Sequence, residues 1–408
     1  MITDTSSLLT SAATYQSDLT AFLRDLVRIP SVNGRDPESP LAERIQVGAN
    51  KLGLESRLVA LQPYRPNILV TYGAGSDKFA LIGHMDTVAE GAPANWSSPP
   101  FAADIQQGRI LGRGAADNKA GIACGLYTLA LLRDLKLIDP VRQQVILAGV
   151  VDEESGACSP LGVRHLLDSG ELQARGAIYT YTSDIVCIGH RGLLRLELNA
   201  HGQAIHAGLA EWHNHVRGAN AVTALADLLL KLESLNIPAI ALPGFEHLGL
   251  TITPGTILNG GSFPSIVPDS ANAVVDIRLL PGQSAAEVLE IVQTQIRAVE
   301  NKRPRITFEM KVTVDIPGAF IPKDHPLALL AQEYTEVLTD RRWETAGAGP
   351  ANEGYMLIGA GIPTLCGFGP SGGNPHAPDE WVEINSLPAT VAMFAGIIHD
   401  YLKLSKGE

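Results

Sequence analysis

The sequence predicts an α/β protein in which a mostly parallel sheet has helices on both faces and a smaller α+β domain is inserted. Between about residues 19 and 186, short apolar runs alternate with amphipathic stretches, the rhythm of parallel strands joined by helices. The texture changes between about residues 194 and 311, and the first rhythm resumes from residue 317. We therefore expect one domain made of the two outer segments.

Two apolar runs in the first segment predict central strands. Residues 79–83 and 145–151 are almost entirely apolar, as expected of strands that are buried on both faces, and each run ends abruptly in polar residues. A helix is expected between them, running through residues 126–132.

The middle segment has a β-α-β-β-α-β-like order, which is typical of a ferredoxin-like domain. Residues 194–200 and 273–279 predict strands, and residues 219–235 and 285–299 predict helices.

The last segment returns to the first texture, with a predicted helix at residues 327–338 and an apolar run at 361–367. The predicted boundaries are residues 1–192 and 315–408 for the outer domain and 193–314 for the insert.

Charge and composition exclude several classes of function. The net charge of −12 opposes binding to nucleic acid or to an anionic membrane through a general basic face. The four cysteines lie far apart without CxxC spacing, so neither a disulfide framework nor a thiolate zinc site is expected. Residues 1–16 lack the pattern of a secretory signal, and no apolar run approaches the roughly 20 residues of a membrane-spanning helix. We expect a cytoplasmic protein.

His84 and Asp86 follow the first apolar run. Side chains at positions i and i+2 of an extended segment share a face, so Asp86 is suited to orient a metal-bound His84 imidazole. The structural alternative is a histidine at a strand end, bonded to its neighbour in an ordinary loop.

Asp117 lies in a glycine-rich motif, residues 112–121, directly before the predicted helix. It is a candidate metal ligand, but Asp is also a preferred helix N-cap, and taken alone the motif favours the cap. The motif lacks the GxxxxGK[ST] spacing of a phosphate-binding loop.

Three consecutive acids, Asp152, Glu153 and Glu154, follow the second apolar run. Their mutual repulsion disfavours full ionisation unless a cation lies nearby, which makes them the strongest single indication of a metal. One carboxylate is suited to bind the ion and another to transfer a proton. The alternative is a strand end whose charges face water.

His376 lies in a proline-flanked loop, where a surface histidine is the simplest interpretation. With His84, Asp117 and Glu154, it supplies imidazole and carboxylate ligands of the kind that zinc accepts, and cobalt or manganese less selectively. One metal centre explains the four residues better than four separate structural roles.

The order of the motifs resembles that of the acetylornithine deacetylase, succinyl-diaminopimelate desuccinylase and glutamate carboxypeptidase family of zinc-dependent hydrolases. The motifs are GHMD, GRGAADNKAG, DEESG, GHRG, GQAIHAG, DIRLLPG and NPHAPDE, and they extend over nearly the whole chain. The resemblance implies that His84 binds one metal ion, and that His376 and Glu154 bind the other. It also implies that Asp117 bridges the two ions.

The resemblance further implies that Glu153 is the general base that deprotonates the attacking water, and that Asp86 orients the first histidine. The insert resembles a lid and dimerisation domain, from which His206 reaches the active site of the other subunit and stabilises the oxyanion. Arg278 resembles the arginine that holds a substrate carboxylate, and Asn220 resembles a lid residue. Without the resemblance, His206 and Arg278 are ordinary strand residues.

Two positions depart from the family pattern. Tyr181 stands where the family has the glutamate that completes the first metal site, and a phenol is a poor ligand because its pKa is about 10. Asp184 is the nearest carboxylate that can substitute, and a centre with a single metal is the alternative. Ser265 stands where the family usually has asparagine, so contacts to the substrate or the oxyanion are expected to differ.

The sequence therefore predicts a homodimeric amidohydrolase with one or two zinc ions per subunit, which removes the acyl group from an N-acyl-amino acid. An exopeptidase or dipeptidase is an alternative, as is a hydrolase of another carbon–nitrogen bond. A further alternative is a catalytically weak relative that binds a metal or ligand. The presence of Glu153 argues against the last, because binding alone does not need a general base.

Overall fold

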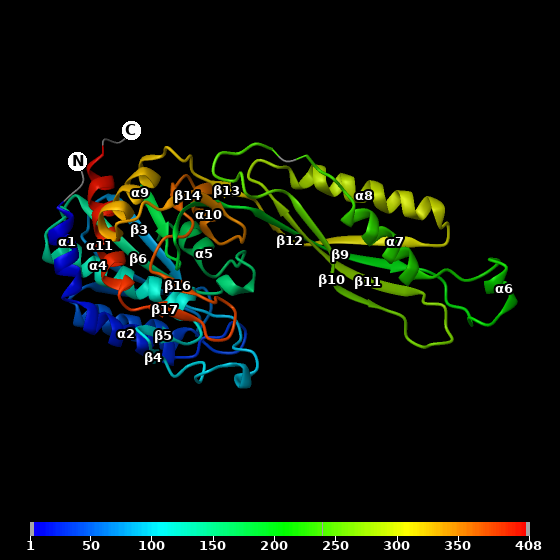
Figure 1. The fold of residues 1–408 in the computed structure, drawn as a ribbon, viewed down its shortest axis with the longest axis horizontal. Coiled ribbons are helices and arrows are strands. Elements are labelled where there is room, and N and C mark those ends of the chain that lie inside the picture. Colours follow the sequence, from blue (N-terminus) through cyan, green and yellow to red (C-terminus); the bar gives the residue numbers. More distant parts are fainter. Residues whose placement is uncertain (1–3, 239, 405–408) are drawn as a thin grey trace. The chain divides into compact units, whose positions relative to one another are not determined.

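The computed structural model describes residues 4–238 and 240–404 and separates into two compact units (Figure 1). Unit 1 comprises Met1–His190, Ala319–Ala348 and Asn352–Glu408, and unit 2 comprises Arg191–Gly318 and Gly349–Ala351. The second unit is thus inserted into the chain of the first.

Unit 1 is built on a six-stranded sheet whose order is β1-β2-β6-β3-β7-β15. The strands are, in chain order, Glu55–Val59 (β1), Asn67–Tyr72 (β2), Asp77–His84 (β3), Gln143–Val150 (β6), Gly176–Tyr179 (β7) and Thr364–Leu365 (β15). The four strands β6, β3, β7 and β15 are parallel, while β1 and β2 join the edge in antiparallel fashion. The predicted mostly parallel sheet is confirmed.

Helices cover both faces of this sheet. The helices of unit 1 are Thr5–Ala13 (α1), Gln16–Arg28 (α2), Ser39–Lys51 (α3), Ala120–Asp134 (α4), Val163–Asp168 (α5), Pro326–Thr339 (α9), Gly354–Gly359 (α10) and Ser386–Lys403 (α11). Alternate residues of β3 face opposite cores, as the period of two in a strand requires. Ile82 belongs to the cluster with Leu166 of α5 and Leu357 of α10. Phe79 packs against Tyr401 of α11, with ring centroids 5.6 Å apart.

Two small sheets complete unit 1. One contains Ile185–His190 (β8), Ala319–Phe320 (β13) and Glu344–Ala348 (β14). The other contains Asp104–Gln106 (β4), Arg109–Leu111 (β5), Gly372–Gly373 (β16) and Trp381–Glu383 (β17). Strand β17 follows the loop that carries the predicted ligand His376.

Apart from one short additional helix after the first strand, unit 2 has the predicted β-α-β-β-α-β order around one antiparallel sheet, arranged β10-β11-β9-β12. Its elements are Gly192–His201 (β9), Ala210–His213 (α6), Ala221–Glu233 (α7), Thr251–Gly260 (β10), Ser270–Leu279 (β11), Ala285–Lys302 (α8) and Thr307–Ile316 (β12). Leu194, Leu196 and Leu198 alternate along β9 and share one core with the apolar faces of α7 and α8.

Within the described ranges, we find no helix that combines the length and the apolar character needed to cross a membrane.

Candidate metal centre

Three predicted ligands meet at the carboxyl end of the main sheet. His84 is the last residue of β3, and Glu154 lies in the turn Glu153–Ser155 that follows β6. Because β3 and β6 are parallel neighbours, the residues after both strands lie at the same edge. Asp117, in the turn before α4, joins them, and the ligand atoms of the three side chains lie within 4.8 Å of one another.

The Asp117 carboxylate faces two imidazoles. Its Oδ1 lies 2.8 Å from Nε2 of His84, and its Oδ2 lies 3.3 Å from Nε2 of His376. The same His376 nitrogen lies 3.1 Å from Oε1 of Glu154. A carboxylate with one imidazole at each oxygen has the arrangement of a ligand that bridges two ions, and imidazole and carboxylate are ligands that zinc accepts. The residues present therefore fit a metal centre.

The pKa values of the two histidines also indicate a site for positive charge. Hydrogen bonds to Asp117 and Glu154 raise the pKa of His376 to about 10, although its partial burial opposes the increase. Burial lowers the pKa of His84, but the bond to Asp117 outweighs it and the net pKa is raised. Carboxylates this close to the imidazoles stabilise positive charge at the site. That charge is supplied either by protons on the imidazoles or by a metal cation that takes the place of these protons.

Asp117 does not cap the helix. Helix α4 begins at Ala120 with Lys119 as its N-cap, so the capping alternative was wrong. Instead, the turn Ala115–Lys119 is held by Glu380. The buried Glu380 carboxylate accepts hydrogen bonds from the backbone of this turn, including the N–H of Asp117 at 2.9 Å.

Asp86 contacts His84 mainly through its backbone. Nδ1 of His84 lies 3.0 Å from the carbonyl oxygen of Asp86 and 3.8 Å from its Oδ1. The Asp86 carboxylate accepts hydrogen bonds from the backbone N–H groups of Glu153 at 3.2 Å and Glu154 at 2.9 Å, and from Nδ2 of Asn33 at 2.6 Å. Asp86 therefore also ties the end of β3 to residues 152–155, which we call the acidic turn.

Glu153 is buried beside the cluster. Its Oε1 accepts a hydrogen bond of 3.2 Å from the hydroxyl of Tyr181. Burial raises the pKa of Glu153 well above its usual value, with a lowering contribution from His84 and a further increase from Glu154. A raised carboxyl pKa near a metal cluster suits a group that exchanges protons.

Tyr181 stands at the position where the resemblance to the hydrolase family predicts a glutamate. Its ring centroid is 5.6 Å from that of His84, and its ring stacks on Tyr179 at 5.3 Å. Burial and the nearby Glu153 raise the pKa of Tyr181 well above its usual value, so the phenol stays neutral. Asp184 does not replace the glutamate: its side chain is 76% exposed and pairs with Arg341 at 3.8 Å. That part of the prediction was wrong.

No local pattern in the sequence points to two further buried acids near the site. Glu353 accepts a hydrogen bond of 3.1 Å from the Tyr179 hydroxyl, and burial raises its pKa to about 8. Glu38 pairs with Arg65, which also lies 2.9 Å from Asp152 of the acidic turn. The partners in each pair are far apart along the chain, so only the fold brings them together.

The remaining predicted residues lie in unit 2. Asn220 caps α7, accepting a bond of 3.0 Å from the N–H of Thr223. Arg278 donates to the Asp276 carboxylate at 2.7 Å. His206 accepts a bond of 3.0 Å from the N–H of Gly208, next to the strand bridge that joins it to residue 266.

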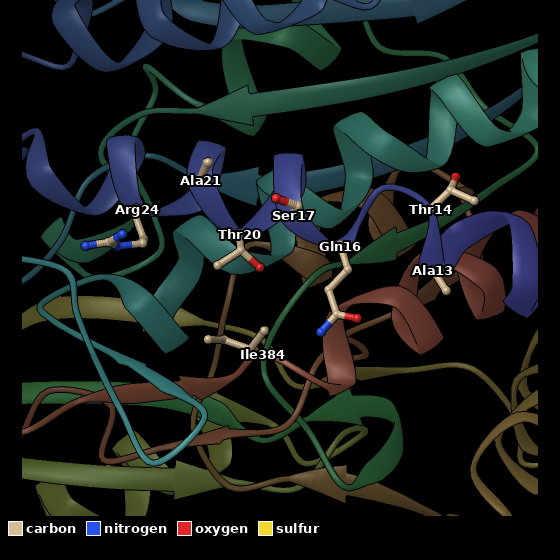
Figure 2. Close-up of a pocket in the computed structure, with 8 residues that line it drawn as sticks. All are labelled: Ala13, Thr14, Gln16, Ser17, Thr20, Ala21, Arg24 and Ile384. Carbon is tan, nitrogen blue, oxygen red and sulfur yellow. The ribbon is translucent and has the colours of Figure 1, made fainter.

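A depression on the helical side of unit 1 contains none of the predicted site residues (Figure 2). It is lined by Ala13, Thr14, Gln16, Ser17, Thr20, Ala21, Arg24 and Ile384. Arg24, the charged residue in this lining, donates to the carbonyl oxygen of Ala103 at 2.9 Å.

The chain is similar in sequence and in fold to several known proteins. The model of peptidase family M20/M25/M40 matches residues 80–400. The uncharacterized protein YgeY of Escherichia coli (strain K12) is 28% identical over 406 residues, covering 96% of both chains. Succinyl-diaminopimelate desuccinylase of Cereibacter sphaeroides is 28% identical over 402 residues, covering 94% of this chain and 99% of the relative. A dinuclear metal-binding peptidase of the M20 family from Bacillus subtilis has a similar fold, with a TM-score of 0.70 at 16% identity, covering 96% of this chain and 99% of that one.

Proposed function

The chain belongs to peptidase family M20/M25/M40, a family of metallohydrolases, and we propose that it hydrolyses the amide bond of an N-acyl-amino acid with Glu153 as general base. The observation that carries this proposal is a buried carboxylate, Glu153, beside the cluster of His84, Asp117 and Glu154. Its Oε1 accepts a hydrogen bond from the Tyr181 hydroxyl, and within the described part of the chain no imidazole is hydrogen-bonded to this carboxylate. A relative named succinyl-diaminopimelate desuccinylase supports the choice of an acyl-amino acid.

His84, Asp117, Glu154 and His376 are the proposed ligands of one or two zinc ions, with cobalt or manganese as replacements. When bound, the metal polarises the scissile carbonyl group and increases the acidity of the attacking water. Glu153 takes a proton from that water and returns it to the leaving nitrogen.

We propose that Asp86, through its bonds to the acidic turn, keeps Glu153 and Glu154 in place during this transfer. The Tyr181 hydroxyl, which donates to Glu153, restricts the rotation of the same carboxylate.

For unit 2 we propose the role of a lid and dimerisation domain, with domain boundaries at residues 1–192, 193–314 and 315–408. In the homodimer, His206 stabilises the oxyanion, Arg278 binds a carboxylate of the small-molecule substrate, and Asn220 is a residue of the lid. The four cysteines lie far apart in the sequence without CxxC spacing, which supports a cytoplasmic location.

Exopeptidase or dipeptidase activity is the second candidate. The Bacillus subtilis structure of similar fold is named as a peptidase, and the same centre is chemically able to hydrolyse a peptide bond. The two candidates differ in the group on the substrate nitrogen, because a deacylase needs an acyl group whereas a dipeptidase accepts a free amino terminus.

The test is hydrolysis of a panel of N-acetyl-amino acids, N-succinyl-amino acids and dipeptides by the full chain, before and after chelation and after zinc is restored. We expect turnover of an N-acyl-amino acid that chelation abolishes and zinc restores. Turnover of dipeptides alone would favour the exopeptidase. No turnover by the zinc-loaded protein on any member would favour a binding protein.

A further inference from the structure

We propose that the metal centre binds one ion tightly and a second ion only weakly, because the hydroxyl of Tyr181 is committed to Glu153. The inference rests on the proposed function only for the location of the centre. Its test measures metal binding and does not need turnover.

The number of donor side chains limits how many ions the centre can hold. Among residues 4–238 and 240–404, the cluster brings together two imidazoles and two carboxylates: His84, Asp117, Glu154 and His376. Four such donors complete the tetrahedral coordination of one zinc ion. They are too few for two complete sites, even if one carboxylate is shared.

Two ions would share these donors unequally. An ion next to His376 has that imidazole, Glu154 and Oδ2 of Asp117 within reach, since these atoms lie 3.1 to 3.3 Å from Nε2 of His376. An ion next to His84 has that imidazole and Oδ1 of Asp117, which are 2.8 Å apart. The His84 side therefore needs one more protein donor to match the other side.

Tyr181 lies beside His84. The ring of Tyr181 lies 5.6 Å from the His84 ring, close enough for position 181 to influence this side of the centre. Its hydroxyl proton is used in the 3.2 Å hydrogen bond to Glu153. To bind a metal, the phenol oxygen would have to give up that bond to Glu153.

Neighbouring side chains hold Tyr181 in this position. The Tyr181 ring stacks on Tyr179 at 5.3 Å, and the Tyr179 hydroxyl is itself bonded to the buried Glu353 at 3.1 Å. Two stacked rings with separate carboxylate partners hold each other in place. Tyr179 also offers a matched control, because it belongs to the same stack but bonds to a different carboxylate.

The experiment titrates the metal-free full chain with zinc in competition with a chromogenic chelator, and repeats the titration on Tyr181→Glu, Tyr181→Phe and Tyr179→Phe. In the wild type we expect one tight ion and a second that binds at least about 100-fold more weakly. Tyr181→Glu supplies the missing carboxylate and should strengthen the second site about tenfold or more. Both phenylalanine variants should keep the two wild-type affinities.

Three results would overturn the inference: two ions of equal affinity in the wild type, loss of affinity in Tyr181→Phe but not in Tyr179→Phe, or a folded Tyr181→Glu variant whose second site is no stronger. Cobalt loading gives an independent readout. A tyrosinate absorption band that appears in the wild type and is absent in Tyr181→Phe would mean that the phenol is a ligand.

Circular dichroism establishes whether Tyr181→Glu folds. If it does not, the wild-type stoichiometry, the Tyr181→Phe titration and the cobalt spectrum decide the question. One tight ion in a chain that hydrolyses no substrate would refute the proposed function and leave this inference standing. Turnover by a chain that binds two ions with equal affinity would support the proposed function and refute this inference.

Discussion

The buried carboxylate of Glu380 accepts a hydrogen bond of 2.9 Å from the backbone N–H of Asp117, the residue that faces both histidines of the metal centre. The same carboxylate accepts bonds from the N–H groups of Gly114 at 3.0 Å and Ala116 at 2.8 Å, and it pairs with the buried Arg113. Glu380 therefore fixes the turn that carries a proposed ligand without being one itself.

We expect Glu380→Gln to weaken zinc binding about tenfold or more and to lower the free energy of unfolding by about 3–5 kcal/mol. The reason is that Arg113 loses its countercharge while it remains buried. Zinc titration and urea unfolding measure the two effects. Glu336→Gln is the control, since its pair with Arg342 is about half exposed and should change the stability by less than about 1 kcal/mol. Unchanged zinc affinity in Glu380→Gln would contradict its positioning role.

Glu153→Gln separates proton transfer from metal binding. The amide keeps the size of the side chain but cannot act as a base, so we expect kcat on the best N-acyl substrate to fall by about 10²–10⁴-fold. The metal content per chain should stay as in the wild type. Asp184→Asn, a change at an exposed carboxylate that pairs with Arg341, should leave kcat unchanged. A Gln variant with near-normal turnover would remove Glu153 from the mechanism.

The sequence was most informative where the chemistry is local. The apolar run at 79–83 lies within β3, and the run at 145–151 matches β6 up to Val150, with Val151 directly after the strand. The polar residues that end the two runs lie at one edge of the sheet because the strands are parallel neighbours. Two ligands on adjacent strand ends need no knowledge of long-range packing. The grouping of His84 with Glu154 was predictable for that reason.

Contacts between residues that are far apart in the chain could not be predicted from the sequence. Asp117 has a strong local preference for capping a helix, but bonds to Glu380, which is 263 residues away in the chain, place its carboxylate between two imidazoles instead. Likewise, the resemblance to the hydrolase family implies that Tyr181 replaces a glutamate, yet only the fold reveals that its hydroxyl is bonded to Glu153. Nearness in sequence made Asp184 a candidate, and the fold turns it outward to Arg341.

Gly121, near the start of α4, allows that helix to approach the end of β7. A Cβ atom at this position would lie 2.3 Å from Oγ1 of Thr180, whose hydroxyl is held by the carbonyl oxygen of Ile82. We therefore expect Gly121→Ala to lower the free energy of unfolding by about 1–3 kcal/mol, measured by urea unfolding.

Gly359→Ala is the matched control for this helix contact. Gly359 is the last residue of α10, and its added Cβ would meet no atom within 4 Å. The substitution should raise the stability by up to about 1 kcal/mol, because alanine favours the helix more than glycine does. Equal effects of the two substitutions would contradict the close approach at Gly121.

Glu353 should make the stability of the metal-free protein depend on pH. Burial raises its pKa from 4.5 to about 8, so the folded protein keeps a proton that the unfolded chain releases above pH 4.5. Its contribution to stability is fully present below pH 4.5 and is lost as the pH rises to about 8. The loss is at most about 1.4 kcal/mol per pH unit.

Glu353→Gln tests this contribution, because glutamine stays neutral and its carbonyl oxygen can still accept the bond from Tyr179. Urea unfolding in the presence of a chelator, at pH 5, 6, 7 and 8 (roughly the window between the two pKa values), gives the difference in free energy between variant and wild type. We expect this difference to shift in favour of the variant as the pH rises. Glu336→Gln, at an exposed position, should give a curve parallel to the wild type. A Glu353→Gln curve that is also parallel would mean that Glu353 takes up no extra proton on folding.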